Sequence, residues 1–195
     1  MIPLTLPIKV DLTHIPLSDA QFYQLCLNNP SLAIERDSRG ALIFMSPVGG
    51  ESGNKELELG IDLGLWNRRT RLGKVFSSST LFKLRGGGDR SPDAAWVELS
   101  RWQSLTPEQR QKFPPIAPDF VIELRSPTDS LSTLQEKMQE YMSSGVRLGW
   151  LINPQQQQVE IYRQGSEKEV RSLPTELSGD AVLPDFTLTV EQFDD

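Results

Sequence analysis

The clearest hydrophobic pattern in the chain runs from Asp119 to Arg163. Residues 119–125 form an apolar, β-rich run that predicts a strand. A helix is expected to follow and to end at Gly145, because apolar residues recur at helical spacing: Leu131, Leu134, Met138, Tyr141 and Met142. Residues 147–152 and 159–163 predict two further strands. A strand, a helix and a second strand form a crossover unit with parallel strands, so we expect an α/β (α+β) fold with a mixed central β-sheet flanked by helices.

Shorter patterns upstream predict further helices and strands. Ser18 and Gln21 form a capping-box pattern at the start of one helix. A second helix is expected over about residues 52–69, with these residues facing the core: Leu57, Ile61 and Leu65, and Leu59 or Trp66 as further candidates. The other expected elements are strands at residues 32–35, 41–45, 74–78, 81–85 and 94–98 and a short helix that starts at Thr106-Pro107.

The composition is typical of a folded domain. The chain has 195 residues, of which 37% are hydrophobic, and its mean hydropathy is -0.36. We therefore expect one domain over residues 1–195, with residues 1–17 as an N-terminal extension. No run approaches the roughly 18 apolar residues of a membrane span, and the N-terminus lacks the pattern of a secretory signal. The sequence thus predicts a cytoplasmic protein without a membrane partner.

Charge and metal-binding residue types narrow the possible functions. Cys26 is the only cysteine and His14 the only histidine, which excludes multi-thiolate zinc sites and HExxH chemistry. Any metal must therefore be held by oxygen ligands. A net charge of -6 argues against a protein that coats nucleic acid over its whole surface. Seven basic residues nevertheless lie between Arg68 and Arg90, against the single acid Asp89, and they indicate either a phosphate-facing surface or an ordinary solvated one.

Two carboxylates stand out because of their surroundings. Asp93 precedes the apolar run of residues 94–97, and Glu123 lies inside the run of residues 120–124. A carboxylate in such a strand is costly to bury unless it is paired, hydrogen-bonded or bound to metal. The alternatives are that Glu123 points to solvent or pairs with Arg125.

Lys137 flanks the apolar stripe of the predicted crossover helix. Its stem can follow this stripe and carry the ammonium group toward Glu123. The alternative is a surface lysine paired with Glu136 or Glu140. Two carboxylates and a lysine are the groups needed for metal-dependent phosphodiester cleavage, in which oxygen ligands hold Mg²⁺ or Mn²⁺ and an ammonium group stabilises the attacked phosphate.

Four segments carry a family resemblance: Ser91-Pro92-Asp93, residues 118–127 (PDFVIELRSP), residues 136–141 (EKMQEY) and residues 145–154 (GVRLGWLINP). They closely resemble the Uma-two family of bacterial endonucleases, as do residues 45–51 and 182–186. The resemblance covers about Ser18 to the C-terminus. It implies a restriction-endonuclease-like fold of the PD-(D/E)xK superfamily, and a Mg²⁺- or Mn²⁺-dependent endonuclease that acts on DNA.

The resemblance also implies roles for individual residues. Asp93 and Glu123 match the two metal-binding acids, and Leu124 completes the expected metal site. Arg125 stands where the superfamily has its lysine, two positions after the second acid. This departure implies that the catalytic lysine has moved to Lys137, with Tyr141 on the same helical face. Arg125 remains a competitor for this role, because alternate residues of a strand share one face.

Several points stay open at the level of the sequence. Glu51 is the candidate for a further catalytic acid, or else a favourable charge at a helix start. Nucleases of this fold commonly act as dimers, so the resemblance also allows a homodimer. Two other function classes are a catalytically silent scaffold or nucleic-acid-binding module that keeps the fold, and a two-carboxylate glycosidase, which would need a sugar cleft lined by aromatic residues.

Overall fold

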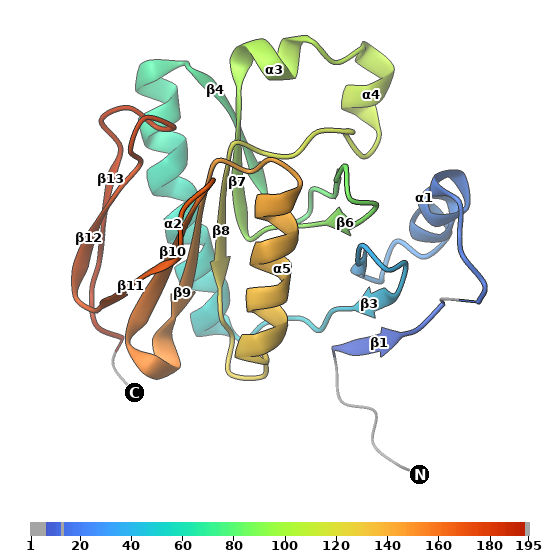
Figure 1. The fold of residues 1–195 in the computed structure, drawn as a ribbon, viewed down its shortest axis with the longest axis horizontal. Helices are drawn as coiled ribbons and strands as arrows, with labels where there is room; N and C mark the ends of the chain where they lie inside the picture. The colour runs from blue at the N-terminus through green and yellow to red at the C-terminus, as the bar shows by residue number, and fades with distance from the viewer. Residues whose placement is uncertain (1–6, 13, 194–195) are drawn as a thin grey trace.

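A six-stranded sheet forms the centre of the computed structural model, which describes residues 7–12 and 14–193 (Figure 1). Its strands are β4 (Gly73–Ser77), β7 (Ala94–Glu98), β8 (Phe120–Leu124), β9 (Leu148–Asn153), β10 (Gln158–Arg163) and β11 (Glu169–Ser172). In space they follow the order β11-β10-β9-β8-β7-β4. Only β8 and β9 pair in parallel among these described strands. The predicted mixed sheet is therefore confirmed.

Two smaller sheets accompany the central one. The N-terminal sheet contains β1 (Ile8–Val10), β2 (Ile34–Arg36), β3 (Leu42–Phe44), β5 (Phe82–Lys83) and β6 (Asp89–Arg90). Its spatial order is β1-β3-β2-β6-β5, so part of the expected N-terminal extension belongs to a sheet. The third sheet is a hairpin of β12 (Thr175–Ser178) and β13 (Thr187–Val190).

The two longest helices cover the two faces of the central sheet. The helices are α1 (Asp19–Asn28), α2 (Gly50–Thr70), α3 (Leu99–Gln103), α4 (Pro107–Gln111) and α5 (Leu131–Ser143), with a short 3-10 turn η1 (Pro154–Gln156). In Figure 1, α5 lies in front of the sheet, α2 lies behind it, and the N-terminal sheet lies on the side of α5 away from β12 and β13. None of the helices in the described ranges is long and apolar enough to cross a membrane.

The side chains of β8 alternate between two separate hydrophobic cores. Phe120 and Ile122 pack in the core shared with α2, β12 and β13, whereas Val121 packs in the core beneath α5. Successive strand residues point to opposite faces, so Glu123 lies on the same face as Val121. The alternation of side chains along this strand thus places one carboxylate between the sheet and α5.

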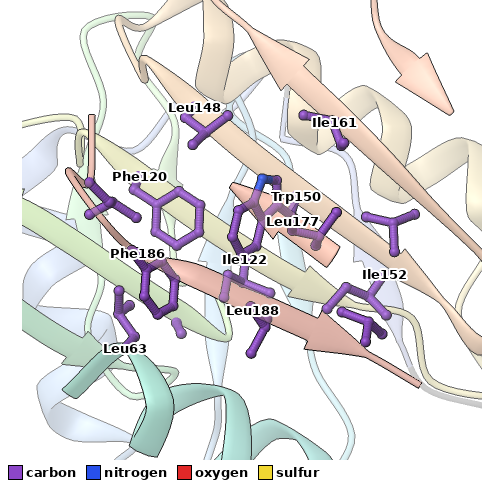
Figure 2. Packing of buried hydrophobic residues seen from close by; sticks show 14 of the residues in the cluster. Leu63, Phe120, Ile122, Leu148, Trp150, Ile152, Ile161, Leu177, Phe186 and Leu188 are labelled. Carbon is purple, nitrogen blue, oxygen red and sulfur yellow. The ribbon is translucent and has the colours of Figure 1, made fainter. Parts of the chain in front are cut away.

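Stacked aromatic rings hold the larger core together (Figure 2). The rings of Trp150 and Phe186 are nearly parallel, with centroids 6.0 Å apart, and Phe120 meets Trp150 edge-on at 4.7 Å. Phe186 also contacts Trp66 of α2 at 5.6 Å. These rings join the central sheet, α2 and the segment before β13 into one packed layer.

Most of the predicted local structure is confirmed. Capping boxes begin α1 at Ser18 and α4 at Thr106, and Gly145 follows α5 with a φ of 105°, as its position predicted. Gly149 of β9 allows α5 to approach closely, because a Cβ there would lie only 2.5 Å from the Met138 Cε. The strand, helix and strand of the crossover unit therefore pack tightly.

The inward face of α2 differs from the prediction. Leu57, Ile61 and Leu65 were expected in the core but are exposed. Trp66, one of the two further candidates, is buried as expected, together with Leu63. The reason is that α2 is apolar on two faces, so its periodicity allows either one to turn inward. Ring contacts of Trp66 with the aromatic core select the face that is buried.

Replacing Phe186 by alanine should lower the free energy of unfolding by about 3–5 kcal/mol, because it removes three ring contacts and leaves a cavity. Urea denaturation followed by circular dichroism measures this loss. Leu27→Ala, at a position that is 53% exposed, is the control and should change stability by less than about 0.5 kcal/mol. Equal losses in the two variants would contradict the role assigned to Phe186.

Candidate active site

A buried ion pair links β8 to α5. The Lys137 Nζ lies 2.9 Å from the Glu123 Oε1 and 3.0 Å from its Oε2. The Tyr141 hydroxyl, one helical turn further along α5, donates a 2.9 Å hydrogen bond to Oε1. All three side chains are buried. Lys137 therefore follows the apolar stripe inward as predicted, and the alternative of a surface lysine is excluded.

Asp93 lies beside Glu123, immediately before the neighbouring strand β7. Ala94 of β7 is opposite Ile122 of β8, which places the preceding Asp93 at the level of Glu123. The backbone N–H of Leu124 donates a 2.6 Å hydrogen bond to the Asp93 Oδ2. Burial, together with the nearby charge of Glu123, raises the pKa of Asp93 well above its usual range. The two acids thus share a space in which their charges repel.

A third acid, Glu35 of β2, reaches the same lysine from the N-terminal sheet. Its Oε1 lies 2.9 Å from the Lys137 Nζ and accepts a 2.9 Å hydrogen bond from the backbone N–H of Ser91. The Lys137 Nζ also donates a 3.0 Å hydrogen bond to the Ser91 carbonyl. Glu35 is only 3% exposed. One ammonium group therefore joins α5, β8, the segment before β7 and the N-terminal sheet.

Arg90 of β6 extends this network on the far side of Glu35. Its Nη1 lies 3.0 Å from the Glu35 Oε2, and its Nη2 lies 2.6 Å from the Glu140 Oε2 of α5. Arg90 and Glu140 are themselves buried at their side chains. The result is a row of alternating charges that ties the two sheets together through α5.

The sequence prediction did not include Glu35, although a signal was present. Ile34, Glu35 and Arg36 form a short strand in which every residue is buried. Burying two charged residues next to an apolar one requires partners for the charges, which is the same reason that singled out Glu123. The pattern around Glu35 predicted only one arm of a hairpin, because its partners lie far away in the chain.

The charges of this network do not balance. Its members are four carboxylates and two cations: Glu35, Asp93, Glu123 and Glu140, and Arg90 and Lys137. Burial raises the pKa of Glu123, and Lys137 opposes this effect only in part. For Glu35 burial is outweighed by Lys137 and Arg90, so its pKa lies below the usual range. Burial would lower the pKa of Lys137, but the surrounding acids outweigh it and raise that pKa.

A cavity of about 520 Å³ opens onto these groups. Asp93, Glu123, Lys137 and Glu35 line it, together with Glu56 of α2. The other lining residues are mainly apolar but include seven serines: Ser31, Ser46, Ser52, Ser78, Ser79, Ser91 and Ser126. Within the described part of the chain, the lysine is the one cation in this wall. The cavity therefore offers neutral hydrogen-bond donors and a single positive charge beside an excess of acids.

The donor set fits a magnesium-like ion. The described residues contain no group of three His, Cys, Asp or Glu side chains that could hold a metal ion by themselves. Asp93 and Glu123 supply carboxylate oxygens at a cavity wall, and a divalent cation would relieve their repulsion. Mg²⁺ commonly binds through one or two carboxylates and completes its octahedron with water and substrate phosphates. Two carboxylates at the wall of an open cavity match this mode of Mg²⁺ coordination.

Three predicted site residues are not among those that line the cavity: Tyr141, which contacts Glu123 from α5, Glu51 and Arg125. Glu51 is exposed in the first turn of α2, and Glu56 of the same helix lines the cavity instead. The Arg125 guanidinium donates hydrogen bonds to the Asp129 carbonyl at 3.1 Å and the Asn153 Oδ1 at 3.2 Å. Arg125 is not among the residues that line the cavity beside Glu123, because these bonds hold its guanidinium elsewhere.

The basic segment from Arg68 to Arg90 does not form one face. Arg90 is buried among acids, and Lys83 pairs with Asp19 of α1. The exposed members at the end of α2 and the start of β4 are Arg68, Arg69, Arg71 and Lys74. Two of the seven basic residues therefore serve ion pairs within the fold, and a phosphate-facing surface stays a prediction for the exposed ones.

Two acids on adjacent strands beside a buried lysine, on a mixed sheet with a crossover helix, define a restriction-endonuclease-like protein. The chain belongs to the Uma2 family, whose sequence model, described as "Putative restriction endonuclease", matches residues 19–191. This places it among the endonucleases, which are hydrolases, and confirms the family resemblance.

One solved structure shares this fold over nearly its whole length. It is described as a "putative nuclease belonging to DUF820" from Anabaena variabilis ATCC 29413. The two structures agree with a TM-score of 0.73 and 23% sequence identity, covering 89% of this chain and 95% of that chain. This likeness establishes the fold. No curated protein matches the sequence.

Asp93→Asn and Glu35→Gln should change stability in opposite directions near neutral pH when metal is removed by a chelator. The raised pKa of Asp93 means that its ionised form destabilises the fold, so Asp93→Asn should raise the free energy of unfolding by about 1–2 kcal/mol. Glu35→Gln should lower it by about 3–5 kcal/mol, because two buried cations lose a partner.

Urea denaturation at several pH values tests both effects. The gain from Asp93→Asn should shrink as the pH falls from the raised pKa of the folded protein toward the ordinary value of about 4, below which the carboxyl is neutral in both the folded and the unfolded chain. The loss from Glu35→Gln should persist until the pH falls below about 4, because the pKa of Glu35 in the folded protein is lowered. Stabilisation by both variants would contradict the charge distribution described above.

Proposed function

We propose that this protein is a Mg²⁺- or Mn²⁺-dependent endonuclease that hydrolyses phosphodiester bonds in DNA. The observation that carries the proposal is the convergence of Asp93, Glu123 and Lys137 on one cavity. Two acids with surplus negative charge can bind a divalent cation, and the protonated lysine can face the phosphate. Membership of the Uma2 family supports the same reaction class.

Asp93 and Glu123, with the backbone of Leu124 beside them, are the groups that would hold the metal ion. When bound, such an ion neutralises charge on the phosphate and lowers the pKa of a coordinated water. The hydrogen bonds from Lys137 and Tyr141 fix the orientation of the Glu123 carboxylate. The Leu124 N–H does the same for Asp93. Both acids are thus held in place before a metal arrives, which reduces the entropy lost on binding.

Lys137 is the group that we expect to stabilise the attacked phosphate. Its ammonium group stays protonated because the surrounding acids raise its pKa, and it lines the cavity. Hydrolysis forms a bond from a water oxygen to phosphorus and breaks the bond to the leaving sugar oxygen, while negative charge grows on the phosphate oxygens. Glu35 and the Ser91 carbonyl act as positioning groups that hold the ammonium at the cavity wall.

DNA is the proposed substrate, and the cytoplasm is the compartment where we expect the reaction. The excess of acids around the cavity would repel a phosphodiester until a divalent cation is bound. Serine hydroxyls in the wall can then donate hydrogen bonds to the sugar-phosphate backbone without selecting particular bases. This arrangement makes the metal ion a condition for productive binding of substrate.

A catalytically silent nucleic-acid-binding module with the same fold is the second candidate. Both Glu123 oxygens accept hydrogen bonds from Lys137 or Tyr141 in this structure, and a protein without turnover could retain that arrangement for stability alone. A silent module would bind Mn²⁺ weakly or not at all. Metal titration therefore separates the two candidates without an assay of cleavage.

Asp93→Asn and Glu123→Gln should each reduce Mg²⁺-dependent cleavage of plasmid DNA by at least about a hundredfold, because each removes a charged metal ligand. Gel electrophoresis measures cleavage, and calorimetric titration with Mn²⁺ should show weaker binding in both variants. Glu51→Gln, at the exposed start of α2, is the matched control and should leave both quantities unchanged. Full cleavage by either site variant would contradict the proposed metal site.

Lys137→Met should reduce cleavage by about a hundredfold or more while Mn²⁺ affinity stays nearly unchanged, because the change removes the charge but keeps an apolar side chain. Arg125→Met is the comparison and should have a much smaller effect, since its guanidinium is held by Asp129 and Asn153. Circular dichroism checks that both variants fold. Loss of activity with Arg125→Met, but not with Lys137→Met, would reverse the assignment.

A further inference from the structure

Helix α2 carries a second apolar stripe on the face opposite its buried one. Leu57, Ile61 and Leu65 recur every four residues and are 60%, 40% and 51% exposed. Ile61 and the buried Leu63 are about 200° apart around the helix, given 3.6 residues per turn. Adjoining large aliphatic side chains on a surface commonly mark an interface with another protein.

The stripe borders a groove between α2 and β4, which is an edge strand of the central sheet. The groove has a volume of about 690 Å³, and Gly60, Gly64, Val75 and Phe76 are among its lining residues. A Cβ on Gly60 or Gly64 would meet no atom within 4 Å. Packing within the chain therefore does not require glycine at these positions. Their small size leaves room for side chains that approach from outside.

The charges of α2 identify the kind of partner that fits this face. The first half, residues 50–60, contains Glu51, Lys55, Glu56 and Glu58, for a net charge of -2. The second half and its C-cap, residues 61–71, contain Asp62, Arg68, Arg69 and Arg71, for a net charge of +2. An identical helix in the antiparallel direction places each acidic half against a basic half. A parallel copy would instead bring like charges together.

We infer that this face is a homodimer interface, in which α2 packs antiparallel against α2 of a second copy about a twofold axis at Ile61. Such an interface is self-complementary, because the same patch meets itself. Ile61 then lies against its own counterpart, and Leu57 lies against Leu65 of the second copy. The glycines receive the aliphatic side chains of the opposing helix, as small residues do where helices approach closely.

The interface would lie next to the candidate active site. Asp93 and Glu56 line both the groove beside α2 and the cavity that contains Lys137. Two copies joined through α2 would therefore hold their two cavities on either side of one shared axis. This inference does not rest on the proposed chemistry, because it concerns assembly alone and its test requires no cleavage.

Sedimentation velocity of the full chain at 1–100 µM tests the oligomeric state. We expect a dimer, and Ile61→Glu should weaken it at least tenfold, because two carboxylates would meet on the axis. Val170→Glu is the matched control: Val170 is 48% exposed on β11, at the opposite edge of the central sheet, and the dimer should persist. Circular dichroism should show native folding for both variants, since both side chains are exposed.

Crosslinking tests the twofold geometry directly. In a Cys26→Ser background, Ile61→Cys should form a disulfide between two copies when diamide oxidises the two thiols. Val170→Cys should remain a monomer under the same denaturing gel conditions. A wild-type chain that is monomeric at 100 µM overturns the inference. So does a dimer that survives Ile61→Glu, or an Ile61→Cys variant that does not crosslink, because either result places the interface elsewhere.

Discussion

The buried ammonium group of Lys137 is the interaction on which the rest of this structure depends. It lies within 2.9 Å of carboxylate oxygens from both Glu123 and Glu35, which belong to different sheets. A charge can be buried at tolerable free energy only when opposite charges and hydrogen bonds replace water. The central sheet, α5 and the N-terminal sheet must therefore pack together in one arrangement, or several charges are left buried without partners.

This constraint gives the N-terminal sheet a part in the site. Glu35 and Arg90 both come from that sheet, and together with Glu140 of α5 they continue the row of alternating charges. The same contacts that fix the packing also aim the lysine at the cavity. The same side chains consequently stabilise the fold and form the proposed site. Among them, four carboxylates outnumber two cations. The surplus lies at Asp93 and Glu123, where a divalent cation would have its largest effect on charge repulsion.

Helix α2 shows how an aromatic core decides what remains on the surface. Trp66 packs against Trp96 and Phe186, and this contact turns one apolar face of the helix inward. Ile61 and its neighbours on the other face are then left beside the edge strand β4 and the candidate active site. The position of one tryptophan thus leads both to a closed core and to an apolar surface that a second copy of the chain can cover.

The sequence by itself determined the elements whose signals are local. The crossover unit, the capping box at Ser18 and the glycine after α5 follow from periodicity and cap chemistry, and the apolar run around Glu123 indicated that its carboxylate needed a partner. The single cysteine and single histidine indicated that any bound metal would be held by oxygen ligands. Tertiary structure alone added Glu35 to the partners of Lys137, because Glu35 reaches it through the docking of a separate sheet. It also decided which face of α2 turns inward, since a helix with two apolar faces can bury either one. The direction of the Arg125 side chain was open as well, because this residue follows the last position of β8 and its partners come from other segments.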